Sequence, residues 1–321
     1  MERRLRIQNK IGRSRAVLPV CVMLTLLLWW FPQGGYSHSY AWSLLIAALV
    51  AYVVTETNNI HQLLRVRSRM ISAVWLSVLA CMGFTHPFHP AMLSALALSV
   101  SHFLLFRTYQ QLQPVADVFH SFLALALGSV AFPPLILFAP FFLWYLVVFM
   151  RALTLRTFFA ALVGLLLPFW FWGGWILWQG DVSSLVQWWQ KLSGGMTTAG
   201  LHSSALQLRL SALTATPSPV ALAFLLLALL TVWTAVAYLL HSFDDKIRTR
   251  MMLYVYVSQS LLILLFSLFA ADFLPLLPLL LLTSSPLVAH FFTFRTSWAS
   301  LVLFFLTLLA LGSLAWLTLR E

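Results

Sequence analysis

The stretch VALAFLLLALLTVWTAVAYLLHSFDDKIRTR, residues 220–250, decides the fold. Residues 220–241 contain no Asp, Glu, Lys or Arg, and a helix of about 20 apolar residues crosses the hydrocarbon core of a bilayer. Five charged residues then follow within 244–250. Backbone polar groups in lipid must be bonded within their own segment, and a helix achieves this. The stretch therefore predicts a transmembrane helix that ends in a charged turn.

The whole chain repeats this alternation. It has 321 residues, of which 61% are hydrophobic and 8% charged, and its mean hydropathy is +0.92. About a quarter of the residues of a soluble domain are charged. We therefore predict an all-α, polytopic transmembrane helical bundle that forms a single integral membrane domain over residues 1–321. About 11 spans are expected, or as few as nine if some short ones are re-entrant: 16–31, 38–54, 70–84, 91–106, 115–132, 134–150, 158–178, 220–241, 252–270, 274–292 and 297–318.

The basic residues orient these spans. Cytoplasmic loops of membrane proteins carry the excess of Lys and Arg. With the N-terminus in the cytoplasm, 16 of the 19 Lys and Arg fall on the inner side, and only Lys191, Arg209 and Arg320 fall outside. We expect a bacterial inner (cytoplasmic) membrane. The basic start and following apolar run also resemble a signal peptide, but no small-x-small cleavage site follows, which favours an uncleaved first helix. The excess of basic residues on the inner side also explains the formal charge of +11 without nucleic acid, which is not expected as a partner.

One long segment, 179–219, lies on the predicted outer side. Leu185, Trp188, Trp189 and Leu192 recur at helical spacing and predict an amphipathic helix on the membrane surface. The segment either packs over the bundle or covers a lipid-linked substrate. In the second case, His202 and Arg209 would bind its phosphate, since the guanidinium fork donates two hydrogen bonds at once.

Polar residues at the predicted inner side form two candidate groups. Asp117 and His120 share a helix face, and Arg107 ends the preceding span. These three either form a functional cluster or include a salt bridge that anchors two helix ends. The second group lies in TETNNIHQLLRVRSRM, residues 55–70. The excess of basic residues in cytoplasmic loops explains its arginines, but not Glu56, Asn58, Asn59 and His61. If the helix runs through this loop, Asn58, His61, Arg65 and Arg69 form one polar stripe, suited to anionic lipid head groups at the cytoplasmic face or to a membrane-protein partner.

The span 274–292 contains Pro275, Pro278 and Pro286, with Ser284 and Ser285 between them. Transporters build substrate sites from broken helices, so the two serines are candidate substrate-binding residues. Proline also kinks helices that hold no site, and that alternative stays open.

Asp244 and Asp245 are adjacent carboxylates of the kind that can hold magnesium. Lys246, Arg248 and Arg250 follow at once, which favours local neutralisation. The sequence contains no P-loop, HExxH, GxSxG or CxxC motif. We therefore assign no catalytic residue, no metal site and no cofactor.

Two stretches, FHSFLALALGSVAFPPLILFAPFFLW (119–144) and RALTLRTFFAALVGLLLPFWFW (151–172), resemble a family of uncharacterised multi-pass inner-membrane proteins of Bacteroidetes. The resemblance extends to the ENN…RVRSR loop and covers about the central half of the chain. It implies a location and a topology, but no catalytic residues.

Two functions fit these observations. The favoured one is a non-enzymatic component for transport or envelope assembly, because catalytic carboxylates are scarce and prolines interrupt the span at 274–292. The alternative is a membrane enzyme that acts on lipid-linked glycans at the outer face, in the manner of a polymerase or ligase, through the loop that carries His202 and Arg209.

Overall fold

The computed structural model describes residues 7–14, 16–30, 38–66, 68–194, 218–270 and 273–320. Within these ranges the chain forms helices and turns and contains no β-strand. The predicted all-α bundle is confirmed.

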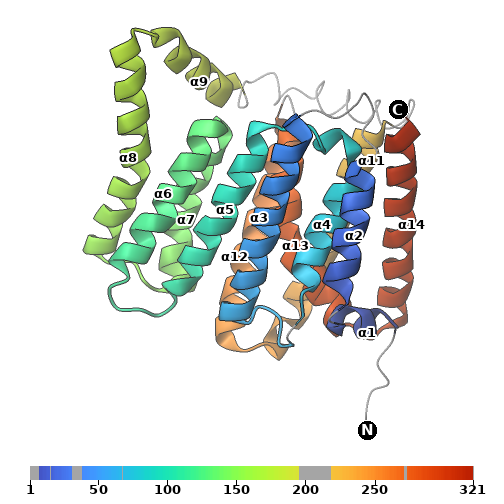
Figure 1. The fold of residues 1–321 in the computed structure, drawn as a ribbon. Coiled ribbons are helices and arrows are strands. Elements are labelled where there is room, and N and C mark those ends of the chain that lie inside the picture. The colour runs from blue at the N-terminus through green and yellow to red at the C-terminus, as the bar shows by residue number, and fades with distance from the viewer. Residues whose placement is uncertain are drawn as a thin grey trace. The chain divides into compact units, whose positions relative to one another are not determined.

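Most helices coincide with the apolar runs of the sequence (Figure 1). In chain order they are α1 (Ile7–Arg13), α2 (Val17–Trp30), α3 (His38–His61), α4 (Met70–Cys81), η1 (Gly83–Thr85), α5 (Pro90–Arg107), α6 (Val115–Ala131), η2 (Pro133–Phe138), α7 (Ala139–Tyr145), η3 (Leu146–Met150), α8 (Leu155–Gln179), α9 (Val182–Gly194), α11 (Pro219–His241), η5 (Ser242–Asp244), α12 (Ile247–Phe269), η6 (Leu274–Leu276), α13 (Leu277–Phe294) and α14 (Trp298–Arg320).

Eight helical segments of the described chain are long and apolar enough to cross a membrane, or nine if α1 and α2 form one bent span. The apolar helices α4 and α6 are shorter. The chain therefore has the architecture of a membrane protein. Each predicted span overlaps one of these helical segments, but the number that cross the bilayer stays a prediction.

The helices group into two compact units. Unit 1 contains α1 to α4, η1, α11, α14 and the larger parts of α12 and α13; unit 2 contains α5 to α9, the end of α12 and the start of α13. The expectation of a single integral membrane domain stays an expectation.

Unit 2 is built by close approach of α5, α6 and α8, which lie side by side in Figure 1. Ser101 and Ser121 each donate a hydroxyl hydrogen bond to the other's backbone carbonyl, at 2.8 and 2.9 Å. A Cβ atom added at Gly164 of α8 would lie 2.5 Å from the carbonyl oxygen of Phe119. Small residues thus bring these helix backbones together, as is common between helices in membranes.

The predicted surface helix is present in unit 2 as α9. Its Trp188 donates an indole hydrogen bond to the Ser129 carbonyl at 3.1 Å and packs against Phe169 and Trp172. Trp189 is 63% exposed. One side of α9 is therefore held by the unit, while the other carries an exposed aromatic ring suited to a membrane interface.

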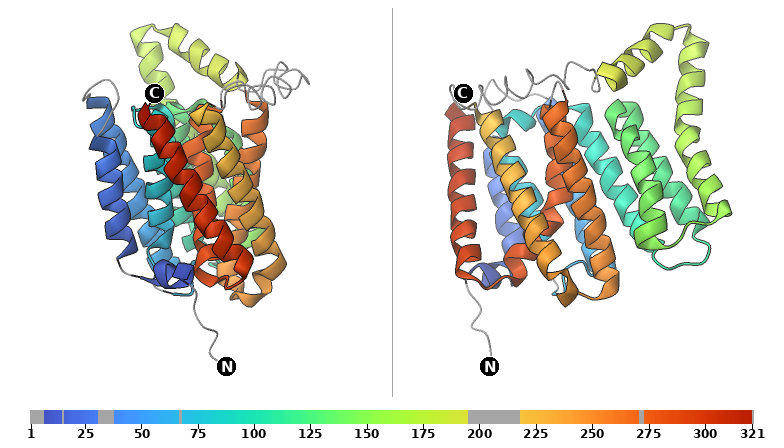
Figure 2. Two further views of the ribbon diagram at one scale, coloured as in Figure 1. Left: turned by 90° about the vertical axis from the view of Figure 1, so that its right-hand side faces the viewer. Right: turned by 180° about the vertical axis from the view of Figure 1, so that it is seen from behind.

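Unit 1 packs α4 against α2, α3 and α14, and α14 also packs along α11 (Figure 2). Trp75 of α4 donates its indole hydrogen bond to the Ala47 carbonyl of α3 at 3.0 Å. Near the α4–α5 connection, the rings of His86 and Trp29 stack 3.8 Å apart. Burial lowers the pKa of His86 to about 4, although its bond to the Ala80 carbonyl opposes this. The ring is therefore neutral at pH 7.

Helix α13 differs from the broken helix considered from its prolines. Pro275 lies in the short turn η6, and the helix then runs unbroken from Leu277 to Phe294 with Pro286 inside it. The hydroxyls of Ser284 and Ser285 donate to the carbonyls of Leu281 and Leu282 within the same helix. Helix α13 therefore keeps its helical path through Pro286 beside the two serines, and the substrate-binding role of Ser284 and Ser285 stays a prediction.

Candidate functional site

The loop after α3 does not continue the helix. Helix α3 ends at His61, and Gln62 has a positive φ of 52°. The Asn58 side chain accepts a hydrogen bond from the Leu64 amide at 2.9 Å and donates to the Ser68 carbonyl at 2.8 Å. Asn58 therefore closes the loop. The continuous polar stripe of Asn58, His61, Arg65 and Arg69 is wrong, because the turn at Gln62 ends the helix before Arg65.

The other candidates in this loop have local partners. Asn59 donates to Glu56 at 3.4 Å in an exposed position. His61 is 2% exposed, and its Nδ1 lies 3.5 Å from a terminal nitrogen of Arg248. The lipid or partner contact predicted for these residues stays a prediction.

The structure brings together two of the three residues predicted at the start of α6. Arg107 Nε and Asp117 Oδ1 lie 3.3 Å apart, with side chains 50% and 17% exposed. His120 is exposed, and its Nδ1 contacts the Ala116 carbonyl of its own helix at 2.7 Å. The geometry matches the alternative of a salt bridge that anchors two helix ends.

The remaining predicted substrate residues divide into two pairs. Ser284 and Ser285 are buried, 1% and 0% exposed, and both hydroxyls bond within α13. His202 and Arg209 lie outside the described residues.

A charged centre that the sequence analysis did not assemble lies in unit 1. The Asp245 carboxylate, with its side chain 1% exposed, accepts a hydrogen bond from Arg65 Nε at 2.5 Å and lies 3.1 Å from His290 Nε2. We call these three residues the Asp245 cluster. The sequence predicts neutralisation of Asp245 by Lys246, Arg248 and Arg250. Its ion-pair partners are instead Arg65 and His290, because the fold turns the Asp245 side chain toward the α3–α4 loop and α13.

The ionisation of Asp245 reflects two opposing effects. Burial by itself would raise the pKa of the carboxyl, because it removes water from the charged form. The contacts with His290 and Arg65 outweigh burial and hold the pKa below its ordinary value. Asp245 is therefore an anion at neutral pH.

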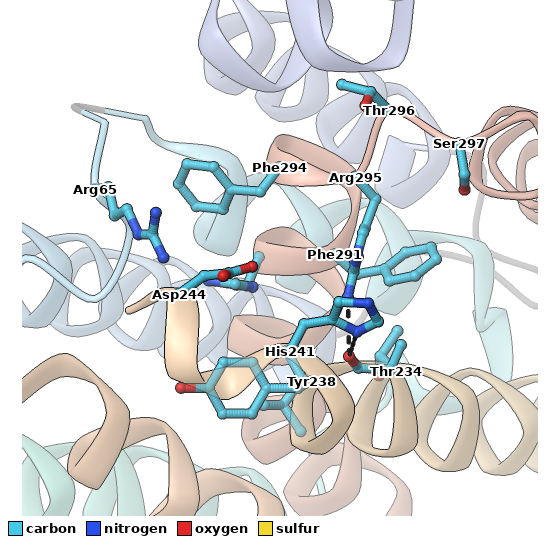
Figure 3. A pocket seen from close by; sticks show the side chains of 13 residues that line it. Arg65, Thr234, Tyr238, His241, Asp244, Phe291, Phe294, Arg295, Thr296 and Ser297 are labelled. Atoms are coloured by element: carbon cyan, nitrogen blue, oxygen red, sulfur yellow. Dashed lines mark hydrogen bonds between the residues drawn. The ribbon is translucent and has the colours of Figure 1, made fainter. Parts of the chain in front are cut away.

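A cavity of about 760 Å³ adjoins this cluster (Figure 3). Its wall comes from the α3–α4 loop, the end of α11 with η5, the second half of α13, and the segment after α13. The side chains that carry its polar chemistry are Arg65, Thr234, Tyr238, His241, Asp244, His290, Arg295, Thr296 and Ser297. Phe291 and Phe294 add apolar surface.

Two basic side chains of this cavity share one anchor. Arg295 Nη2 donates to the Ala237 carbonyl at 3.2 Å, and His241 Nδ1 contacts the same oxygen at 3.2 Å. Figure 3 shows both contacts meeting at this atom. The shared anchor fixes two cationic or donor groups beside each other at the end of α11.

Helix α1 fixes the segment that carries Arg295. The Asn9 amide donates to the carbonyls of Phe292, Thr293 and Arg295 at 3.2, 3.1 and 2.9 Å. The Gln8 amide donates to the Arg295 carbonyl at 2.7 Å. These amides satisfy carbonyls at the C-terminal end of α13, which have no partner within the helix.

Sequence reasoning had a weak signal for this site. Arg65 and Asp245 are 180 residues apart, and each has an ordinary explanation by itself, one in topology and one in local charge balance. His290 and Arg295 at the end of an apolar span were the remaining signal, because ionisable groups are costly there. Among the described residues, no group of three or more His, Cys, Asp and Glu side chains could hold a metal ion.

Comparison with known proteins adds no further constraint. No family model, curated protein or solved structure matches the chain.

Proposed function

We propose that this chain is a non-enzymatic transport component of a bacterial inner membrane and that the Asp245 cluster is its proton-responsive element. The observation that carries the proposal is the buried Asp245 carboxylate between Arg65 and His290, beside a cavity at the end of several spans. Ionisable residues that pair inside a helical membrane protein often mark ion pathways and proton relays.

The chemistry of the cluster supports proton transfer. Asp245 lies against a guanidinium and an imidazole, and imidazole is the side chain that ordinarily exchanges protons in the physiological pH range. The His290 side chain is 15% exposed and lines the cavity, so a proton can reach it from that side. A purely structural ion pair would explain the contact less well, because a buried pair contributes little net stability once desolvation is included.

The position of the cluster supports an inner-side site. The segments predicted to be cytoplasmic in unit 1 are those around α1, the α3–α4 loop, the α11–α12 turn and the α13–α14 connection. Hydrogen bonds and ion pairs join them: Gln8 to Arg295, Ser68 to Gly12, and Arg65 to Asp245. The resemblance to inner-membrane proteins of Bacteroidetes agrees with this location, and anionic lipid head groups are the proposed surroundings.

Proton movement in proteoliposomes tests the proposal. The full chain is reconstituted in vesicles that contain a pH-sensitive dye, and an inward proton gradient is imposed. We expect faster acidification than in protein-free vesicles, and a return to the protein-free rate for Asp245→Asn and for His290→Gln.

The matched control is Asp117→Asn, which removes a carboxylate from the exposed ion pair with Arg107 and should acidify like the wild type. Equal rates for the wild type, Asp245→Asn and protein-free vesicles would contradict a proton role for the cluster.

A further inference from the structure

We infer that the cavity beside the Asp245 cluster binds an organic anion with a phosphate-type oxyanion group, and that binding is linked to proton uptake. The inference names a substrate class for the site of the proposed function and rests on it for transport, although binding can be tested without transport.

The donors that would meet an oxyanion come from separate segments of the cavity wall. Arg295 uses one terminal nitrogen on the Ala237 carbonyl, and its guanidinium offers further N–H donors. His241 uses Nδ1 on the same carbonyl, which leaves Nε2 as the other ring position. Thr296 and Ser297 add hydroxyls to the same wall. A tetrahedral oxyanion has enough acceptor oxygens for several such donors at once, and guanidinium groups suit it by geometry.

The size and apolar part of the cavity indicate an organic ligand. A volume of about 760 Å³ lies within the usual range for small-molecule sites and exceeds the needs of a bare inorganic ion. Phe291, Phe294 and the ring of Tyr238 line it. The anion is therefore expected to carry an apolar or aromatic portion next to its charged group.

The charges around the cavity link the anion to a proton. Arg65 and Arg295 are balanced by Asp244 on the wall and by Asp245 behind it. With neutral histidines these four groups sum to no net charge, so each proton bound by His241 or His290 adds one positive charge. Anion binding and proton binding therefore favour each other, as linkage requires.

The charged and titratable groups that surround these two histidines come from every neighbouring element. They are Arg65 from the α3–α4 loop, Tyr238, Asp244 and Asp245 from α11 and the turn after it, and Arg295 after α13. Tyr254 and Arg250 of α12 act on the neighbouring Tyr238. Imidazole is the side chain whose charge ordinarily changes within the physiological pH range, so the link to protons is tested between pH 5.5 and pH 8 by substitution of a histidine.

Equilibrium binding tests the inference with the full chain in nanodiscs of phosphatidylcholine. The first probe is phenyl phosphate, measured by calorimetry. His241→Gln should weaken its binding about tenfold by removal of one charge-assisted bond. This variant changes an exposed side chain, so the fold should persist. Arg295→Lys keeps the charge but loses the fork, and should weaken binding by a similar factor.

The matched control is His120→Gln in unit 2. His120 is also exposed and also contacts the carbonyl four residues before it, but it does not line the cavity. Its variant should bind like the wild type. Equal affinity of the wild type and His241→Gln, or no binding of phenyl phosphate to the wild type, would overturn the inference.

Phenyl sulfate tests the proton link, because its charge does not change between pH 5.5 and pH 8 while a phosphate monoester titrates near pH 6. Its affinity should rise as the pH falls, and the rise should shrink in His290→Gln. A pH-independent affinity would overturn the proton link.

Nanodiscs that contain phosphatidic acid distinguish a lipid phosphate from a soluble one. If phosphatidic acid weakens phenyl phosphate binding to the wild type but not to Arg295→Lys, the lipid head group is the occupant. If phenyl phosphate binds the wild type equally well in both kinds of nanodisc, the occupant is a soluble anion. Binding of phenyl phosphate without proton movement in vesicles would support the anion site and contradict the transport proposal. Proton movement without binding would support transport and contradict the anion site.

Discussion

Units 1 and 2 hold their helices together by different means. In unit 2, Gly164 lets α8 approach the backbone of α6, and the Arg107–Asp117 ion pair lies at an exposed helix end. In unit 1, the carboxylate of Asp245 is buried and paired with Arg65 and His290 from distant parts of the chain. Close packing needs no explanation beyond helix association in lipid, whereas a buried charge costs free energy and is a reason to look for function.

The contrast also concerns what each unit tolerates. We expect unit 2 to be sensitive to added volume between its helices. Unit 1 should be sensitive to the loss of single polar groups at the end that carries the Asp245 cluster. The following substitutions separate these sensitivities.

The largest effect is expected for Gly164→Leu. An added Cβ would lie 2.5 Å from the Phe119 carbonyl oxygen and 3.2 Å from the Leu123 amide nitrogen, so the α6 and α8 backbones must separate. Overpacking of this kind costs about 3 kcal/mol. Thermal unfolding in detergent micelles measures it. Gly173→Leu in the same helix is the control, since nothing lies within 4 Å of an added Cβ there. A similar loss at both positions would argue against close packing as the cause.

Arg65→Ala should come next. It leaves the buried Asp245 carboxylate with His290 as its remaining ion-pair partner. The expected loss of unfolding free energy is about 2 kcal/mol. Breaking a fully buried pair costs more, but the Arg65 side chain is 42% exposed. Arg107→Ala removes the corresponding residue of the exposed pair and should cost at most about 1 kcal/mol. Denaturant titration of the two variants compares them directly, and equal losses would contradict the distinction between the units.

Asn9→Ala should have a smaller effect of about 1 kcal/mol, because it removes the amide that caps carbonyls at the end of α13. Asn59→Ala is the control, since its side chain makes an exposed 3.4 Å bond to Glu56. Hydrogen exchange of the α13–α14 connection would locate the change. Unchanged exchange in Asn9→Ala would remove the proposed role of α1 in holding Arg295.

The smallest effect is expected in how steeply stability falls with pH in the acid range. The folded-state pKa of Asp245 lies below its unfolded value because the contacts with His290 and Arg65 outweigh the effect of burial. Its contribution to stability is therefore complete above the unfolded pKa of about 4 and is lost as the pH falls through the folded pKa. In Asp245→Asn, the melting temperature should fall less steeply on acidification than in the wild type. Asp117→Asn should follow the wild type, and parallel curves for all three proteins would contradict the assignment.

The fold was largely predictable and the site largely was not. The apolar runs located the helical segments, since about 20 apolar residues suffice for a span, and the spacing of Leu185, Trp188 and Leu192 located α9. The pair of Arg107 and Asp117 was also found, because ten residues and one turn separate them. The continuous path of α13 was not predicted, because proline marks a position where a helix can bend but does not require it to bend.

The sequence by itself determined where the chain is helical and apolar, because these properties depend on residues close together along it. Only the tertiary structure decided which charges meet. Arg65, His290 and Asp245 lie in three separate segments, and each has a sufficient local explanation until folding places it beside the others. The electrostatic energy of a buried charge depends on the distances to its neighbours and on exposure to water. Both quantities are set only when α3, α11, α12 and α13 pack and the turns at their ends come together.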